Sequence, residues 1–297
     1  MPSTKNPLMQ EFINNVEKIS SHNIDILLEG ETGVGKDFWA KNIYEKYSSN
    51  GKFIAINCAA IPENLVETEL FGAEAGAYTG ARKRIGKIEL ANNGCLYLDE
   101  IDSMPVNIQA KLLRALQEKG CERVGSSEFI YSNFRVIAST KADLLHLIEN
   151  KMFREDLYYR LNVINLKIPP LRQRKEDIID LFKKYIEEYS QKLKIDYKPQ
   201  DLDNKLLQQS LIKHQWKGNI RELISVAQRF LLNIPLEILS NNFITDSDLK
   251  TRLKEIEKSI IISVLKKNQY SLSKSSKELG LPIPTLHYRI KLLNIKL

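Results

Sequence analysis

The sequence predicts an α/β fold with a parallel sheet, followed by a helical region and a small all-helical segment. Short apolar runs alternate with helix-length segments up to residue 168, as in a sheet that is covered on both faces. Pro169 and Pro170 then end this alternation, because neither ring continues a strand ladder or a helix interior. Beyond them the apolar residues recur at helical spacing, as in Ile178, Phe182 and Ile186.

The expected elements follow in order along the chain. Apolar runs of strand length predict strands at 24–29, 53–57, 95–99, 134–139 and 163–168. The segments between them predict helices at 37–47, 62–70, 106–119 and 144–150. A helical stretch then covers about 175–232, with a turn at 216–219, and a linker rich in Asn, Pro, Ser and Asp covers 233–248. Further helices are expected at 249–267, at 273–279 and, after a turn at Gly280, at 285–293; one face of the first comprises Leu249, Leu253, Ile256, Ile260 and Val264.

Composition and charge exclude some classes of protein. The chain has no apolar run long enough to span a bilayer and no signal-peptide centre near its start. Its three cysteines lack metal-ligand spacing and indicate buried thiols in a reducing compartment, so we expect a cytoplasmic protein without a membrane partner. The net charge of +7 is concentrated at 245–297, where 11 Lys and Arg oppose 5 Asp and Glu. This tail is a candidate for nucleic-acid binding, although a solvated helical surface has a similar composition.

Residues 30–36 have the pattern G-x-x-x-x-G-K between an expected strand and an expected helix. Glycines in this context let backbone N–H groups converge on phosphate oxygens, and the lysine neutralises the outer phosphates. Asp37 stands where such loops usually carry the Ser or Thr that contacts Mg²⁺, so that ligand stays open. The predicted nucleotide-binding residues are Gly30, Glu31, Thr32, Gly33, Val34, Gly35, Lys36 and Asp37.

Asp99 and Glu100 come at the end of an apolar run, which places them at the carboxyl end of a strand beside the phosphate loop. We expect Asp99 to hold Mg²⁺, directly or through water, and Glu100 to orient and deprotonate the attacking water. An acidic pair at a strand end is commonly only solvated. The phosphate loop upstream favours the catalytic interpretation.

The residue pattern alone leaves the roles of three arginines open. Arg154 and Arg160 do not share one helix face well and are surface cations by default. In a ring of subunits they are candidates for fingers that reach a neighbour's γ-phosphate. Arg221 is either a nucleotide sensor from the helical region or an ion-pair partner of Glu222.

Together these motifs resemble the AAA+ domain of sigma-54-dependent transcriptional activators, the bacterial enhancer-binding proteins, over nearly the whole chain. Residues 69–72 and 76–81 are similar to the family's ELFG…GAFTGA, with Tyr78 in place of phenylalanine. That hexapeptide is close to diagnostic, because other P-loop ATPases lack it. Asn57 lies in a segment similar to the family's switch for the catalytic glutamate, and an acidic residue at position 37 is usual there.

The resemblance also covers the second half of the ATPase region. Residues 153–161 resemble the element that bears both arginine fingers, Arg154 and Arg160. Residues 169–172 and 216–223 resemble the start of the lid and the sensor II helix. The implied bounds are 1–172 for the AAA+ core, 173–235 for the lid, 236–248 for a linker and 249–297 for a helix-turn-helix domain.

The resemblance implies a homo-oligomeric ring, usually a hexamer with a heptamer left open, that hydrolyses ATP with Mg²⁺ at subunit interfaces. The loop at 76–81, called the tip below, is expected to contact sigma-54 and to remodel the closed promoter complex of RNA polymerase holoenzyme into an open one. Flanking glycines permit a hinge, and a switch driven by hydrolysis needs a bistable loop. The implied sigma-54 contacts are Gly76, Ala77, Tyr78, Thr79, Gly80 and Ala81.

Three features depart from the family pattern. Lys141 stands where sensor I usually has asparagine, so only Thr140 is expected to act near the nucleotide. Ala73 and Ala75 replace the common His and Lys near the tip, which is expected to alter its dynamics. Only about twenty residues precede the first expected strand. We therefore expect regulation by a trans-acting protein, or a chain that lacks a piece of its parent.

The tail resembles the helix-turn-helix of the factor-for-inversion-stimulation type, and implies binding to double-stranded DNA upstream of a promoter. The N-terminal residues of its second helix are expected to read base edges, but Pro282, Ile283 and Pro284 occupy them. A helical oligomerisation module is the alternative. The remaining candidates for phosphate or base contacts are Thr285, His287, Tyr288, Arg289 and Lys291.

Two other functions fit parts of the sequence. One is a DNA-bound regulator whose ATPase serves only oligomerisation, but the intact tip and Glu100 argue against it. The other is an AAA+ motor for a different substrate, which would have no reason to carry residues 76–81. An ATP-driven activator of sigma-54 RNA polymerase accounts for all the motifs.

Overall fold

The structure is a computed structural model of the chain. It describes residues 4–46, 51–78, 80–197, 199, 202, 204–236, 238, 249–293 and 295. The chain forms two compact units, Met1–Leu236 and Glu237–Leu297, and each is described by itself.

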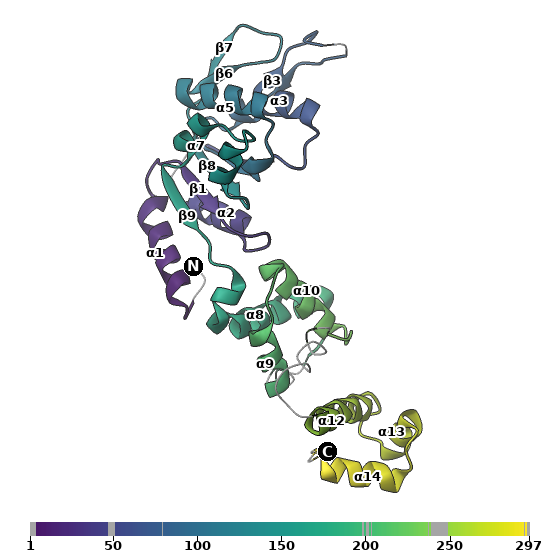
Figure 1. The fold of residues 1–297 in the computed structure, drawn as a ribbon. Helices are drawn as coiled ribbons and strands as arrows, with labels where there is room; N and C mark the ends of the chain where they lie inside the picture. Colours follow the sequence, from purple (N-terminus) through teal and green to yellow (C-terminus); the bar gives the residue numbers. More distant parts are fainter. Residues whose placement is uncertain are drawn as a thin grey trace. The chain divides into compact units, whose positions relative to one another are not determined.

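The first unit is built on a five-stranded parallel sheet with the order β2-β5-β8-β1-β9, which confirms the predicted α/β class (Figure 1). Its register aligns Asn57 with Asp99, and Glu29 with Thr140 and Lys167. The carboxyl ends of the strands therefore meet at one edge, where parallel α/β sheets bind ligands. The strands, each within two residues of its predicted start and end, are β1 (Ile26–Glu29), β2 (Phe53–Asn57), β5 (Cys95–Asp99), β8 (Arg135–Thr140) and β9 (Ile164–Lys167).

Helices cover both faces of this sheet, and the two hydrophobic clusters lie on opposite faces because side chains alternate along each strand. Leu96 and Leu98 of β5 belong to one cluster, whereas Cys95 and Tyr97 belong to the other. The predicted helices appear within two residues of their expected bounds over the described residues, as α2 (Lys36–Lys46), α3 (Glu63–Phe71), α5 (Val106–Glu118) and α6 (Leu144–Glu149). Further short elements are α4 (Lys87–Leu90), η1 (Ile101–Ser103) and α7 (Glu155–Leu161).

An additional helix, α1 (Pro7–Ser20), precedes the sheet and was not predicted. Asn6 caps it by accepting a hydrogen bond from the Met9 N–H at 3.1 Å, and a proline occupies its first turn. Phe12 and Val16 are buried on its inner face, and Phe12 packs edge-on against Trp39 of α2. The Asn-Pro start and the apolar spacing were the signals that could have revealed it.

Two small antiparallel hairpins extend from the same end of this unit (Figure 1). One pairs β3 (Gly72–Ala73) with β4 (Arg84–Ile85), and residues 76–81 lie between its strands. The other pairs β6 (Gly120–Glu122) with β7 (Phe129–Tyr131). A bridge between Ala73 and Val124 joins the hairpins. Neither was predicted, because two- or three-residue strands are too short to show a hydrophobic period.

The lid begins with η2 (Leu171–Gln173) and contains α8 (Lys175–Leu193), α9 (Lys205–Lys213) and α10 (Asn219–Leu231). Where the structure describes it, the predicted helical stretch contains these three helices. The turn before the last helix was expected. Ile178, Phe182 and Ile186 are buried, as their spacing predicted. The linker expected at 236–248 lies almost entirely outside the described residues.

The second unit contains α12 (Leu249–Lys267), α13 (Leu272–Leu279) and α14 (Ile283–Leu292), with Gly280 in the left-handed region at φ 63°. Two residues of the apolar face that the sequence indicated for the first helix, Leu253 and Ile260, are 57% and 49% exposed. The buried residues are Ile261 and Leu265, one position further along. Ile261 and Leu265 are four residues apart, so helical spacing alone did not show which apolar residues pack inward.

Among the helices of the described residues, none combines the length and apolar character that a membrane span needs.

Candidate active site

The phosphate loop joins β1 to α2, as predicted. Gly33 and Gly35 have φ angles of 80° and 99°, which favour glycine. The side chain of Lys36 folds back over the loop, and its Nζ donates to the carbonyls of Gly30 at 2.8 Å and Glu31 at 3.3 Å. Burial lowers the pKa of Lys36, whereas carboxylates, Asp99 first among them, oppose that effect. The loop thus combines a helix N-terminus with a buried cation that faces the acidic strand ends.

Asp99 is held by three donors from three strands. Asn57 Nδ2 donates to Oδ2 at 2.8 Å, while the hydroxyls of Ser139 and Tyr97 contact Oδ1 at 2.5 and 3.1 Å. The Tyr97 hydroxyl also lies 2.7 Å from Asp37 Oδ1, so it bridges Asp37 and Asp99, the expected Mg²⁺ ligand. Burial raises the pKa of Tyr97, and its hydroxyl therefore remains a donor.

Glu100 has a different partner from the one that the sequence indicated. Its carboxylate forms an ion pair with Lys141, with Nζ and Oε2 2.6 Å apart, and its backbone is left-handed at φ 52°. The expected switch residue, Asn57, binds Asp99 instead, and its Oδ1 accepts from the N–H groups of Ala59 and Ala60. Lys141, which stands where the family usually has asparagine, therefore contacts the candidate base, Glu100.

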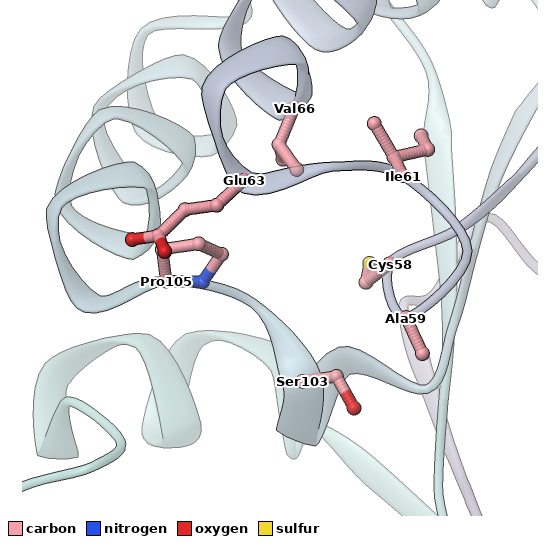
Figure 2. Close-up of a pocket in the computed structure, with 7 residues that line it drawn as sticks. All are labelled: Cys58, Ala59, Ile61, Glu63, Val66, Ser103 and Pro105. Atoms are coloured by element: carbon pink, nitrogen blue, oxygen red, sulfur yellow. The ribbon is translucent and has the colours of Figure 1, made fainter.

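A cavity of about 290 Å³ adjoins the segment that follows Asn57 (Figure 2). Burial raises the pKa of its Cys58 thiol to about 12, which keeps the sulfur protonated. The segment that follows Asn57 is therefore not tightly packed where it borders the cavity. The cavity is lined by Cys58, Ala59, Ile61, Glu63, Val66, Ser103 and Pro105.

The remaining predicted ATPase residues lie in three places. Thr140 is buried and donates to Asp102 Oδ1 at 3.0 Å. Arg154 pairs with Asp156 at 2.7 Å at the start of α7. Arg160 pairs at 2.6 Å with Asp25, which precedes β1, whereas the phosphate loop follows that strand. The guanidinium of Arg160 is therefore at the opposite end of β1 from the loop.

Arg221 lies against the phosphate loop. A Cβ atom added to Gly33 would be 3.1 Å from Arg221 Cβ and 2.3 Å from the carbonyl oxygen of Gly218, so the loop and α10 are in close contact. The alternative pairing of Arg221 with Glu222 is not what the structure has. Glu222 contacts His214 Nε2 at 2.6 Å and accepts from the Gly218 N–H at 2.8 Å.

The tip between β3 and β4 is open on both sides of its turn. Gly76 and Gly80 both have φ 84°, and a Cβ atom at either would meet nothing within 4 Å. Tyr78 is 51% exposed, and Thr79 lies outside the described residues. Ala77 lies against Gly125 of the β6–β7 hairpin, where an added Cβ would come within 2.5 Å. An exposed aromatic residue is thus held between two unhindered glycines.

The base of this tip is joined to its surroundings by an ion-pair cluster. Arg123, from the residues after β6, bonds to Glu74 before the tip and to Glu89 on α4. Glu74 also pairs with Lys83 at 3.4 Å. These contacts connect both hairpins to the helix that packs below them.

The predicted DNA-contacting residues are divided by their exposure. His287, Tyr288 and Lys291 are exposed on α14, whereas Thr285 is half-buried. Arg289 donates to Glu257 of α12 at 3.1 Å and so connects two helices of the unit.

Sequence reasoning did not identify two contributors to the carboxylate site. Tyr97 stands two positions before Asp99, and strand alternation places both on one face. Ser139 was placed in a strand and in the sensor I segment, but no role was predicted for it. The first signal was available in the sequence, while the second needed the pairing of β5 with β8.

Comparison with known proteins identifies three domains along the chain. Residues 3–167 match the sigma-54 interaction domain, 172–260 match the AAA+ ATPase lid domain, and 252–292 match the Fis family of bacterial regulatory proteins. The chain is 46% identical to the pathogenicity locus probable regulatory protein WtsA of Pantoea stewartii subsp. stewartii, over 94% of this chain and 86% of that protein. It is 47% identical to the pathogenicity locus probable regulatory protein HrpS of Pseudomonas syringae pv. syringae, over 94% and 92%.

Among solved structures, NtrX from Brucella abortus in complex with ATP is similar at a TM-score of 0.70 and 28% identity. The similarity covers 99% of this chain and 69% of that one.

Proposed function

The chain belongs to the family of sigma-54-dependent transcriptional activators, with an AAA+ domain, a lid and a Fis-type helix-turn-helix, and we propose that it converts ATP hydrolysis into opening of the sigma-54 promoter complex. In this proposal it remodels the closed complex while it is bound to upstream double-stranded DNA.

The observation that carries the proposal is the open tip at 76–81 in the same unit as the phosphate loop. Tyr78 is exposed between two glycines, and a Cβ atom added to either would meet nothing within 4 Å. Such a tip combines an apolar contact with freedom to rotate at both ends. The family match over residues 3–167 includes both the tip and the nucleotide site.

ATP is the proposed nucleotide, in keeping with the ATP complex of the similar NtrX. The donors also suit Mg²⁺, which binds one or two carboxylates and completes its shell with water and phosphate oxygens. Asp99 and Asp37, joined by the Tyr97 hydroxyl, provide such a pair. Bound there, the ion would neutralise charge on the phosphates.

The chemical roles proposed for the protein follow from the contacts around the two strand-end carboxylates. Glu100 orients a water molecule and takes its proton, whereas Asp99 accepts hydrogen bonds from Asn57 and Ser139. Lys36 and Arg221 are placed against the phosphate loop to bind anionic groups. Arg154 and Arg160 are proposed as fingers that act on a neighbouring subunit, which requires a ring, usually a hexamer.

Regulation and location complete the proposal. A trans-acting protein would control the ATPase, and the site of action is the cytoplasm. The proposed domain bounds remain 1–172, 173–235, 236–248 and 249–297, with His287, Tyr288 and Lys291 as the exposed residues for DNA.

A native gel with purified sigma-54, with and without ADP and aluminium fluoride, tests the proposal. A slower complex that forms only with the mimic is expected. Thr79→Ala should hydrolyse ATP at close to the normal rate but form no such complex and activate no transcription. Loss of hydrolysis in that variant, or ATPase activity without any complex in the unmodified protein, would contradict the assigned target.

A further inference from the structure

The side chain of Asn219, at the start of α10, joins the phosphate loop to the lid. Its Nδ2 donates to the Thr32 carbonyl at 3.0 Å and to Glu31 Oε2 at 3.1 Å. Its Oδ1 accepts from the Leu171 N–H, at the start of η2, at 2.8 Å. A single carboxamide thus joins the loop, the start of the lid and the helix that carries Arg221.

Burial and backbone geometry suit an asparagine at this position. Asn219 is 0% exposed and has φ 51°, in the left-handed region that asparagine adopts more readily than most residues. A buried amide that bonds to three groups is costly to replace, since each lost partner leaves a desolvated donor or acceptor. The next residue adds a fourth contact, because the Ile220 N–H donates to the Gly33 carbonyl at 2.9 Å.

The carboxylate of Glu31 is the second link between loop and lid. Both of its oxygens accept from the guanidinium of Arg172, and one of them also accepts from Asn219. This guanidinium lowers the pKa of Glu31 to about 2, so the carboxylate is charged at neutral pH. Arg172 belongs to η2, as does Leu171. The contacts of Asn219 and those of Glu31 therefore both connect the loop with η2 and with the start of α10.

The loop needs such support from outside. Gly33 and Gly35 provide no side-chain packing and leave the backbone many alternative conformations. Lys36 supplies contacts from within the loop. Arg172, Asn219 and Ile220, more than 130 positions away in the chain, add the contacts from the lid.

The geometry points to Asn219 as a positioning residue that makes the shape of the phosphate loop, and hence nucleotide affinity, depend on docking of the lid. This inference rests on the proposed nucleotide site. It gives the lid a route to the phosphates through the loop backbone, separate from the direct contact proposed for Arg221. A lid that swings away would release Thr32 and Glu31 together.

Three variants separate this role from simple loss of folding. Asn219→Gly keeps the left-handed backbone but removes the carboxamide. Asn219→Asp keeps the acceptor for Leu171 but loses both donors and places a second negative charge beside Glu31. Asn219→Asp with Glu31→Gln replaces that repulsion by an amide that can donate to the new carboxylate. Glu31→Gln alone is the matched control.

The assay is equilibrium binding of a fluorescent ATP analogue to the full chain, together with KM and kcat for ATP and the Tm without nucleotide. Asn219→Gly and Asn219→Asp should each bind about 5- to 100-fold more weakly, the range for losing a buried hydrogen-bond partner. KM should rise while kcat at saturation changes less. The double variant should recover part of the loss that Asn219→Asp shows.

Two results would overturn the inference. One is an affinity within twofold of the unmodified protein in both Asn219 variants. The other is a weakened affinity that falls in step with Tm and is not recovered by Glu31→Gln. Lys36→Ala distinguishes these failures from failure of the site itself, since nucleotide binding that survives this change would remove the phosphate loop from the proposed function.

Discussion

Replacement of Lys141 by methionine tests the ion pair on the candidate catalytic base. Methionine keeps most of the length of the side chain and removes its charge. In the unmodified protein Lys141 Nζ donates to Glu100 Oε2 at 2.6 Å, and this hydrogen bond raises the pKa of the ammonium, which therefore stays charged at neutral pH. If Glu100 must leave this partner before it can take a proton from water, we expect the variant to hydrolyse ATP faster.

The magnitude follows from the exposure of the pair. The side chains of Lys141 and Glu100 are 42% and 25% exposed, so water screens their attraction. Partly exposed pairs of this kind contribute ~0.2–1 kcal/mol, and the short distance favours the upper half of that range. A barrier lowered by about 0.5–1 kcal/mol corresponds to a kcat about 2- to 5-fold higher.

Steady-state release of phosphate over a range of ATP concentrations measures the effect. The rise should appear in kcat with KM nearly unchanged, because Lys141 contacts the base and not the phosphate loop. Lys141→Arg, which keeps the charge, is the control and should stay close to the unmodified rate. A fall in kcat for Lys141→Met would refute the reasoning, since it would mean that the ammonium assists the reaction instead of restraining Glu100.

Three further outcomes are expected. Glu100→Gln should bind a fluorescent ATP analogue normally without releasing phosphate, and ordinary turnover would exclude it as the base. Tyr97→Phe removes a buried donor to two carboxylates and should lower the free energy of unfolding in urea by about 1–2 kcal/mol, whereas Tyr131→Phe, at an 80% exposed site, should not. The pKa of Glu31 is lowered to about 2, so its contribution of roughly 0.5–1 kcal/mol is present above about pH 4.5 and lost as pH falls toward 2. The stability gap between the unmodified protein and Glu31→Gln should therefore close over that interval, and a gap that persists at pH 2 would contradict the assignment.

Much of the fold could be predicted because its signals are local. The strand that ends at Asp99 is an unbroken apolar run, and the loop before Lys36 has glycines at the positions that need positive φ. The parallel sheet followed from the alternation of such runs with helices. Two-residue strands such as Gly72–Ala73 show no period, so the hairpin that holds the tip was found only as a motif.

The side-chain partners within the site were harder to predict. The family resemblance implied that Asn57 acts on Glu100, a prediction that stays open, and the structure adds its contact with Asp99, which strand register sets. The same limit applied to α12, where the apolar face was indicated by spacing but Ile261 and Leu265, beside that face, are the residues that pack in the core. Such choices depend on distances between elements, which the order of residues along one element does not contain.

The chain alone therefore identified the phosphate loop, the acidic strand end and the exposed tip, because each is a short contiguous pattern with its own backbone requirement. Folding was needed to pair Glu100 with Lys141, 41 positions away, and Glu31 with Asn219, 188 positions away. These contacts join side chains on different elements. A shift of one residue in strand register or in the start of a helix would turn a side chain away from its partner.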